Sequence, residues 1–406
     1  MTAASAHQTS PVDGGANGTK KPAAPFPSHP LGSLTAEEIR QSSRLIVQRW
    51  PEGTPLQFKS IKLQEPAKKE LVPYLAAERA GKPVPAMDRR SEVHYLLGNT
   101  AKFHVAIVNL SRSAVESHVL LGPHQHPNAD GEEILALEDA VLKDPVVLAE
   151  IAKLQLPEGS VIVTDPWIYG SDGVKNDRFY DDKRLVQCYL YMRDPDNAAE
   201  RDSCHYAFPL PLSPVVDTET KKVVRIDVLP TGLDEKVRPL APWKPVPPNE
   251  YIPEAQPRLR TDLKPLQVHQ PEGASFTVEH FAEMGQLIRW QKWELKVGFN
   301  QREGMVLYDV HYDGHPLFYR LSLSDMAIPY ADPRSPYHRK QAFDLGDVGA
   351  GLMANNLQLG CDCLGSIYYI SGVLADARGQ PVRMPNVICV HEQDAGLLSS
   401  STWPAT

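Results

Sequence analysis

Two short apolar runs joined by a turn occupy residues 305–323, which read MVLYDVHYDGHPLFYRLSL. The runs Met305–Tyr312 and Leu317–Leu323 are rich in the β-branched and aromatic residues that favour strands, and the Asp313-Gly314 pair between them favours a turn. Further strands of the same kind are predicted at Leu287–Val297, Ile367–Leu374 and Val387–Val390. Many short strands separated by turns predict an antiparallel β-sandwich. We expect residues 274–406 to hold only the N-terminal part of it.

The region from residue 28 to residue 115 predicts one helix laid on a small antiparallel sheet. Thr35 and Glu38 fit a capping box, in which each side chain bonds the backbone N–H of the other residue, so we expect a helix to follow as far as about Trp50. Strands are predicted at residues 93–97 and 103–109.

Residues 120–228 repeat this order of elements. A helix is predicted at Glu132–Leu142, and Asp144 with Pro145 predicts the start of a second one, because Asp caps helices well and proline is tolerated in the first turn. Strands are predicted at residues 160–164 and 185–192, with a hairpin around 218–221. The expected fold class is therefore α+β: two helix-on-antiparallel-sheet domains followed by the start of a large antiparallel β-sandwich.

Two segments predict no regular structure. Residues 1–27 are rich in Ala, Ser, Gly and Pro and are expected to form a disordered tail. Residues 229–273 carry closely spaced prolines, a composition that suits an extended linker lying on a surface.

Composition argues against several classes of function. The chain has 42 Lys+Arg against 50 Asp+Glu and no basic stripe, so no nucleic-acid partner is expected. No apolar run reaches the roughly 18 residues of a membrane span, so no membrane partner is expected either. The first residues lack the apolar core of a secretory signal peptide, which favours an intracellular protein, cytoplasmic or peroxisomal.

Candidate catalytic chemistry lies in residues 328–347, which read IPYADPRSPYHRKQAFDLGD. Asp344 stands between Phe343 and Leu345, and apolar neighbours raise the pKa of a carboxylate by desolvation, which suits a general base near neutral pH. From the residues alone, a role for Asp344 in a turn or a helix cap is the commoner case.

Histidine and cysteine give weaker signals. His124 and His126 form an HxH pair of the kind that suits copper on a strand, but they lie in a loop with prolines and no third ligand nearby, so a metal role is not favoured. The five cysteines are too few for a disulfide scaffold, and buried apolar cysteines are the simplest interpretation.

Several long motifs occur in one order along the chain. They are His29–Leu31, Val297–Gly304, Tyr330–Pro333, Ala342–Asp347, Asn355–Gly365 and Met384–Gly396. Together they resemble the copper amine oxidase family in its fungal and bacterial branch, from about residue 28 to residue 396. In this resemblance residues 28–115 look like the N2 domain, residues 120–228 like the N3 domain, and the region from about 250 like the start of the catalytic β-sandwich.

The resemblance implies roles for particular residues. Asp344 matches the proton acceptor, which takes a proton from the Schiff base that the amine forms with a quinone. Tyr330 matches the tyrosine whose hydroxyl hydrogen-bonds that quinone, and Ala342 matches a gate residue of the substrate channel, which a small side chain leaves open. Cys363 and Cys389 match a disulfide pair, which leaves Cys361 free.

The implied cofactors are copper and topaquinone. In the family the quinone is made from a tyrosine in an Asn-Tyr-Asp/Glu motif and copper is held by three histidines, all beyond the segment that matches Met384–Gly396. No Asn-Tyr pair occurs in this chain, and its sequence after Gly396 departs from the family pattern. We therefore expect a C-terminally truncated chain with no copper ligand of its own.

Two functional hypotheses follow. The resemblance implies a homodimeric primary amine oxidase that converts an amine, O₂ and water to an aldehyde, ammonia and hydrogen peroxide. The alternative is that the 406-residue chain is a catalytically inactive fragment or a non-catalytic binding or dimerisation module. An unrelated β-rich scaffold that binds partners through residues 229–273 is a third, weaker hypothesis. The sequence leaves open which amine is used.

Overall fold

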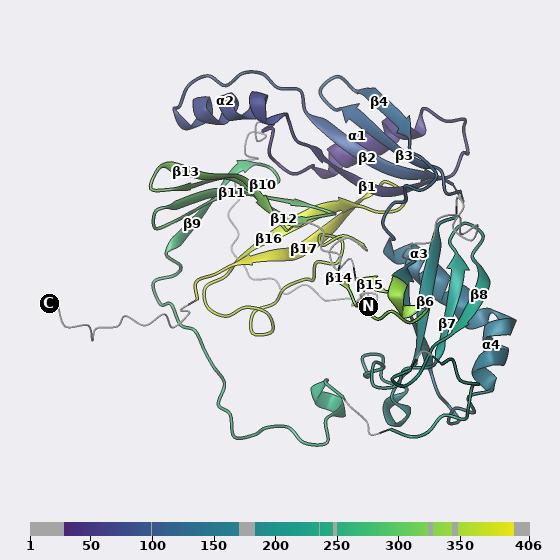
Figure 1. The fold of residues 1–406 in the computed structure, drawn as a ribbon. Helices are drawn as coiled ribbons and strands as arrows, with labels where there is room; N and C mark the ends of the chain where they lie inside the picture. The colour runs from purple at the N-terminus through teal and green to yellow at the C-terminus, as the bar shows by residue number, and fades with distance from the viewer. Residues whose placement is uncertain are drawn as a thin grey trace.

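The computed structural model describes residues 28–98, 100–169, 183–234, 236–246, 250–323, 328–342 and 348–393. The predicted tail at residues 1–27 lies outside these ranges, as does Asp344. Helices and antiparallel sheets form two small modules followed by a two-layered β region, which confirms the expected α+β class (Figure 1). No helix in the described ranges is long and apolar enough to cross a membrane.

The first module packs one helix on a four-stranded sheet. Helix α1 (Ala36–Val47) begins at the predicted capping box, where the Thr35 hydroxyl accepts a bond from the Glu38 N–H and the Glu38 carboxylate accepts one from the Thr35 N–H. Neighbouring strands in this sheet follow one another in the chain: β1 (Leu56–Gln64), β2 (Arg90–Leu97), β3 (Phe103–Asn109) and β4 (Ala114–Leu120). The helix ends at Val47, earlier than the expected Trp50.

A second helix of this region, α2 (Lys68–Arg79), packs elsewhere and was not predicted. Pro73 lies inside it, and an interior proline removes a backbone hydrogen bond. Its buried residues Leu71, Tyr74 and Leu75 contact Val306 and Tyr308 of the β region, which compensates for that loss. Figure 1 shows α2 lying over the sheet of the β region that contains Val306 and Tyr308.

The second module places two helices on one face of another four-stranded sheet. Helix α3 (Gly131–Lys143) is followed by α4 (Pro145–Ala152), and the Asp144 carboxylate accepts bonds from the Val146 and Val147 N–H groups, as the sequence predicts. The strands, in sheet order, are β5 (Ile162–Ile168), β6 (Leu185–Met192), β7 (Leu212–Asp217) and β8 (Lys222–Val228). The β7–β8 hairpin turns where it was predicted.

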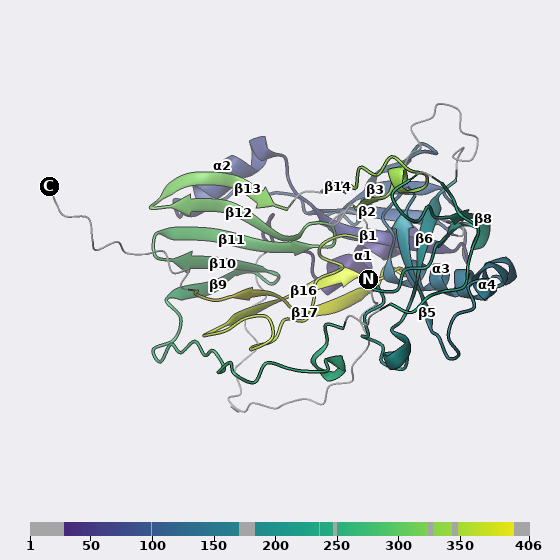
Figure 2. The same ribbon diagram turned by 60° about the horizontal axis from the view of Figure 1, so that its bottom comes forward.

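The third region is a five-stranded antiparallel sheet faced by a hairpin. Figure 2 shows the sheet in the order β13 (His315–Ser322), β12 (Gly304–Tyr312), β11 (Trp293–Asn300), β10 (Gly285–Trp290) and β9 (Phe276–Ala282). The hairpin is β16 (Tyr368–Ala375) and β17 (Pro381–Val390). Val297 and Phe299 of the sheet pack against Ile370, Leu374 and Ile388 of the hairpin.

One strand prediction in this region was wrong. The run Leu287–Val297 is not a single strand, because the chain turns between β10 and β11 and pairs Trp290 with Trp293. Gln291 takes φ 53° there, a left-handed conformation that is uncommon for a residue other than glycine. The run carries no Gly, Asn or Asp at this turn, so the sequence pattern gave no indication that the chain turns here.

The tip of the β16–β17 hairpin reaches the first module. The Phe58 N–H of β1 donates to the Ala377 carbonyl at 2.8 Å. Gly379 has φ 73° and lies so close that a Cβ there would be 2.6 Å from the Ser43 side chain and 2.9 Å from the Phe58 ring. A glycine is therefore required here, both because of the left-handed backbone and because there is no room for a side chain.

The remaining elements are short. The two-residue strands β14 (Ile328–Pro329) and β15 (Gln341–Ala342) pair antiparallel. Single 3₁₀ turns stand at η1 (Pro195–Asn197), η2 (Pro253–Ala255) and η3 (Tyr337–Arg339). The predicted linker, residues 229–273, holds only η2 in its described part, and Leu240 and Trp243 within it pack against the core of the second module.

A buried ion cluster joins the first two modules. The Lys59 ammonium of β1 lies 2.6 Å from an Asp130 oxygen and 3.0 Å from a Glu133 oxygen, and Glu133 also pairs with Arg184. Burial alone would raise the pKa of Glu133, but hydrogen bonding and charge from Arg184 and Lys59 outweigh it and lower that pKa to about 2. Each charge is thus matched by an opposite one.

Replacing Lys59 should destabilise the fold, because it leaves the buried carboxylates with too little positive charge. We expect Lys59→Met to lower the free energy of unfolding by about 3 kcal/mol, because Asp130 and Glu133 are then left with only Arg184 and the more exposed Lys221, which lies 3.9 Å from Glu133. Lys62→Met on the same strand removes a more exposed ion pair with Glu92 and should cost under about 1 kcal/mol. Urea denaturation followed by circular dichroism measures both, and equal losses would contradict the cluster's role.

The contribution of Glu133 to folding stability depends on pH in a definite direction. The depressed pKa of Glu133 contributes stability that is fully present above its ordinary value of 4.5 and is lost as the pH falls towards about 2. The stability advantage of the wild-type chain over Glu133→Gln should therefore shrink between pH 4.5 and pH 2. Denaturation midpoints across that range measure it, and a constant difference would contradict this assignment.

Candidate functional site

The sheet of the second module is buried on both faces. Val186, Cys188, Leu190 and Met192 of β6 point into the core under α3 and α4. Because side chains alternate along a strand, the residues between them line the opposite face. Tyr189 on that face is also buried, so another part of the chain must cover it.

The segment 328–342 provides that cover. It carries β14, η3 and β15, and the Ile328↔Ala342 pairing brings its two ends together. Tyr330 lies against Trp167 of β5, with ring centroids 5.8 Å apart, and remains 55% exposed. Ala342 ends the segment, and the side chain of Ala342 and the whole of Asp344 lie outside the described residues.

Arg339 fastens this segment to the sheet. Its guanidinium is buried and donates to the Asp227 carboxylate of β8 at 2.9 Å and to the Gln187 side-chain oxygen of β6 at 3.2 Å. It also stacks over the Tyr169 ring at 4.4 Å. A planar guanidinium that bonds and stacks at once fixes the segment in one orientation.

The neighbouring residue, Lys340, points its ammonium at three aromatic rings. The Nζ atom lies 4.4 Å from the Trp167 ring centre, 4.3 Å from that of Tyr189 and 5.6 Å from that of Tyr330. The Trp167 indole N–H donates to the Asp165 carboxylate at 2.9 Å, which holds the indole in place. Desolvation lowers the pKa of Lys340, and Asp165 partly opposes this.

Three domain models of one family match the chain. They are the copper amine oxidase N2 domain over residues 29–120, the N3 domain over 132–233 and the enzyme domain over 281–403. The chain belongs to the copper amine oxidase family. The first module is thus an N2 domain, the second an N3 domain, and the β region the start of the enzyme domain.

Relatives match over nearly the whole chain. Copper amine oxidase 1 of Aspergillus niger is 38% identical, over 91% of this chain and 55% of the relative. The peroxisomal primary amine oxidase of Pichia angusta is 34% identical, over 85% and 47%. The crystal structure of a copper-containing benzylamine oxidase from Hansenula polymorpha matches with TM-score 0.83 and 41% identity, over 91% and 56%. The chain therefore spans about half the length of these relatives.

The described residues of this chain do not fit a copper site of the histidine type that the family resemblance implies. Among the described residues, one group of three possible metal-binding side chains comes together, Cys363, Cys389 and His391. Both sulfurs are joined in a disulfide and so are not thiolate ligands. The histidine pair His124 and His126 is exposed in its loop and joins no such group in the described part of the chain.

The disulfide pairing is the one that the resemblance implies. Cys363 and Cys389 are bonded across 26 residues of sequence and tie the β17 strand to the loop before β16. Cys361 is free and exposed, whereas Cys188 and Cys204 are free and buried in the N3 domain. Burial strongly raises the pKa of the Cys188 thiol.

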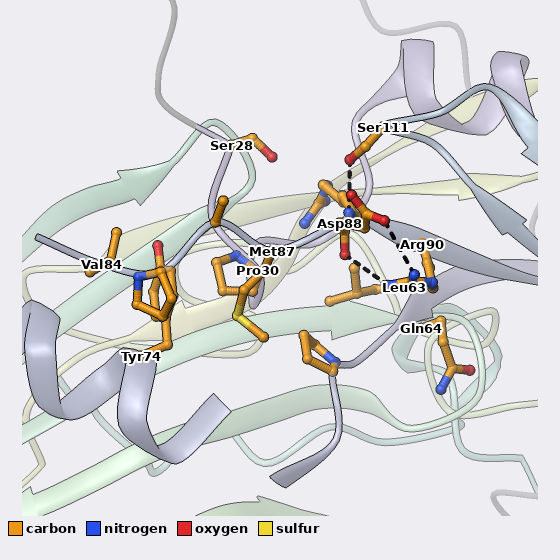
Figure 3. Close-up of a pocket in the computed structure, with 14 residues that line it drawn as sticks. Ser28, Pro30, Leu63, Gln64, Tyr74, Val84, Met87, Asp88, Arg90 and Ser111 are labelled. Carbon is orange, nitrogen blue, oxygen red and sulfur yellow. Dashed lines mark hydrogen bonds and ion pairs between the residues drawn. The ribbon is translucent and has the colours of Figure 1, made fainter. Parts of the chain in front are cut away.

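A cavity of about 340 Å³ lies apart from this site, between the N-terminal segment, α2 and the N2 sheet (Figure 3). Its charged lining is already paired: Asp88 lies 3.4 Å from Arg90, and Arg89 donates to the His29 and Gly32 carbonyls at 2.8 and 2.7 Å. Ser111 accepts a bond from the Arg89 N–H. This cavity therefore has the character of a domain junction and not of a catalytic site.

Sequence reasoning singled out Tyr330, Ala342 and Asp344 as candidates but missed the N3 residues against which the segment 328–342 packs. Trp167, Tyr189 and Asp227 carry no local motif, and nothing in the sequence says that they meet a segment so far along the chain. The available signal was the aromatic and polar alternation of β6, Gln187-Cys188-Tyr189-Leu190-Tyr191, which indicates a second buried face.

Thiol labelling tests the described state of the five cysteines: one disulfide, one exposed thiol and two buried thiols. We expect iodoacetamide to label Cys361 in the native chain at least about tenfold faster than the buried Cys188 and Cys204, because alkylation needs an accessible thiolate. Cys363 and Cys389 should resist labelling until a reductant is added. Peptide mapping by mass spectrometry measures each site, and a Cys361–Cys389 linkage or rapid labelling of Cys389 would contradict the structure.

Proposed function

We propose that this chain supplies the amine-binding side of a copper- and topaquinone-dependent primary amine oxidase, which converts an amine, O₂ and water to an aldehyde, ammonia and hydrogen peroxide. The observation that carries the proposal is the match to primary amine oxidases over about nine-tenths of the chain, which includes the segment holding Tyr330, Ala342 and Asp344. Figure 1 shows β14 and β15, the described strands of this segment, between the N3 domain and the enzyme domain.

In this proposal each of the three residues has its own task. Asp344 accepts a proton from the bound substrate, and the Tyr330 hydroxyl holds the quinone by a hydrogen bond. The small Ala342 leaves the approach open. The antiparallel pairing of β14 with β15 supports a shared site, because it puts Ala342 beside Ile328, two residues from Tyr330 in sequence.

Copper and the quinone are expected from residues that this sequence does not contain. The chain has no Asn-Tyr pair, and the described residues bring no three histidines together. The family's homodimer and a peroxisomal or cytoplasmic location belong to the same proposal. The printed name of the Pichia angusta relative supports the peroxisomal option.

A second candidate function follows from those same absences. In this alternative the 406 residues by themselves are a catalytically inactive fragment or a non-catalytic binding or dimerisation module. The sequence without the quinone tyrosine motif is the observation that favours it.

Substitution of Asp344 tests the catalytic proposal. In the protein that joins this chain to a copper- and quinone-bearing C-terminal part, Asp344→Asn should lower amine-dependent peroxide production by about a hundredfold or more, because a general base is lost. Asp313→Asn makes the same chemical change at an exposed aspartate that pairs with Lys292, and should leave the rate unchanged. Equal rates for the Asp344 variant and the wild-type protein would refute the assignment.

Phenylhydrazine distinguishes the two candidates for the chain as it stands. It reacts with a quinone carbonyl and gives a coloured adduct. We expect the purified 406-residue chain, incubated with copper and air, to give no such absorbance and no peroxide with benzylamine. An adduct would show that this chain makes a quinone from one of its own tyrosines and would overturn the inactive-module proposal.

A further inference from the structure

Trp167, Tyr189 and Tyr330 surround a positive charge that belongs to the chain itself. We propose that these three rings form a binding site for a primary ammonium ion, that Lys340 occupies it in this structure, and that an amine ligand binds there when Lys340 moves out. Nitrogen-to-ring distances of 4.3, 4.4 and 5.6 Å lie within the roughly 6 Å range of cation–π attraction.

The rings are held in place by the fold before any ligand binds. On β5 and β6, Asp165 pairs with Tyr189 and Trp167 pairs with Gln187, so Trp167 and Tyr189 are diagonal neighbours on one sheet face. They meet edge to face with centroids 6.2 Å apart. Tyr330 closes the third side from the enzyme domain, and its backbone N–H bonds the Lys340 carbonyl at 3.4 Å.

The hold on Lys340 is weaker than the hold on the rings. Its ammonium makes no ion pair or hydrogen bond with any described residue, whereas the adjacent Arg339 is fixed by Asp227. Half-burial without a hydrogen-bonding partner is costly for an ammonium, and the lowered pKa of Lys340 reflects that cost. A flexible four-carbon stem lets the ammonium leave for water while the cage remains.

The chemistry of the cage selects the class of ligand. Ring faces attract a cation without requiring a carboxylate, so the site favours small monoamines whose carbon part also contacts the rings, such as benzylammonium. Lys340 stands two residues before Ala342 and four before Asp344. The identification of this ligand as the substrate rests on the proposed function, whereas the binding site itself does not.

Competition by Lys340 has a measurable effect. A ligand that must displace an internal cation binds with its intrinsic affinity multiplied by the fraction of molecules in which the cage is open. Lys340→Met removes the ammonium group and shortens the side chain by one atom. Its neutral, flexible thioether has no cation–π attraction to hold it on the rings, so the cage becomes available. We expect benzylammonium to bind this variant about tenfold more tightly than the wild-type chain, since the ligand no longer competes with an internal cation for the rings.

Titration of the 406-residue chain with benzylammonium chloride, followed by saturation-transfer NMR and calorimetry, tests the proposal without any turnover. Lys340→Arg keeps a cation in the cage and should show no gain. Lys292→Met is the matched control, because Lys292 lies over a single ring, Tyr312, and pairs with Asp313. Adding Tyr330→Leu to Lys340→Met should abolish the gain, and Tyr330 is exposed enough for this change to leave folding intact.

Benzyl alcohol, which has the same shape without the charge, separates ammonium recognition from apolar binding. The proposal is overturned if Lys340→Met binds benzylammonium no better than Lys292→Met does, or if it gains equally for benzyl alcohol. If the gain is seen but the complete protein oxidises no amine, the ammonium site stands and the proposed function fails. If amines are oxidised and no gain is seen, the cage is refuted alone.

Discussion

The candidate site depends on one buried guanidinium. Arg339 keeps its charge at any ordinary pH, so it must retain Asp227 as a partner wherever it is buried. It also bonds Gln187 and stacks over Tyr169, and these three contacts come from three different parts of the N3 domain. The segment 328–342 cannot slide on the sheet without stranding this charge. The positions of Tyr330 and Lys340 follow from that constraint.

The same principle orients the N2 domain. Apolar clusters under α1 and α2 supply most of the stabilising burial, but apolar contacts tolerate small shifts of one surface on another. Charge pairs do not, because a displaced buried charge loses its partner. Lys59 with Glu133 at the N2–N3 junction, and Arg320 with Glu65 between the enzyme domain and N2, therefore define how the domains are placed. The apolar clusters then make that placement stable.

Local signals predicted the local structure well. The capping box of α1, the Asp144 cap of α4 and the β7–β8 hairpin depend on residues a few positions apart, and the structure has all three. Helix α2 was missed because Pro73 argues against a helix and only contacts with a distant sheet reverse that preference. The turn at Gln291 was missed because its left-handed backbone is imposed by the pairing of the two flanking strands.

The candidate site also has a part that the sequence predicted and a part that only the structure shows. Resemblance assigned roles to Tyr330, Ala342 and Asp344, which lie close together in sequence, but it was silent on the N3 surface that Tyr330 contacts. That surface exists because the N3 sheet has helices on one side only and must be covered on the other. The polypeptide that covers it is the segment 328–342, which includes Tyr330 and ends at Ala342. The N3 domain therefore packs directly against the segment 328–342, since burying the second face of its sheet and positioning that segment are one packing event.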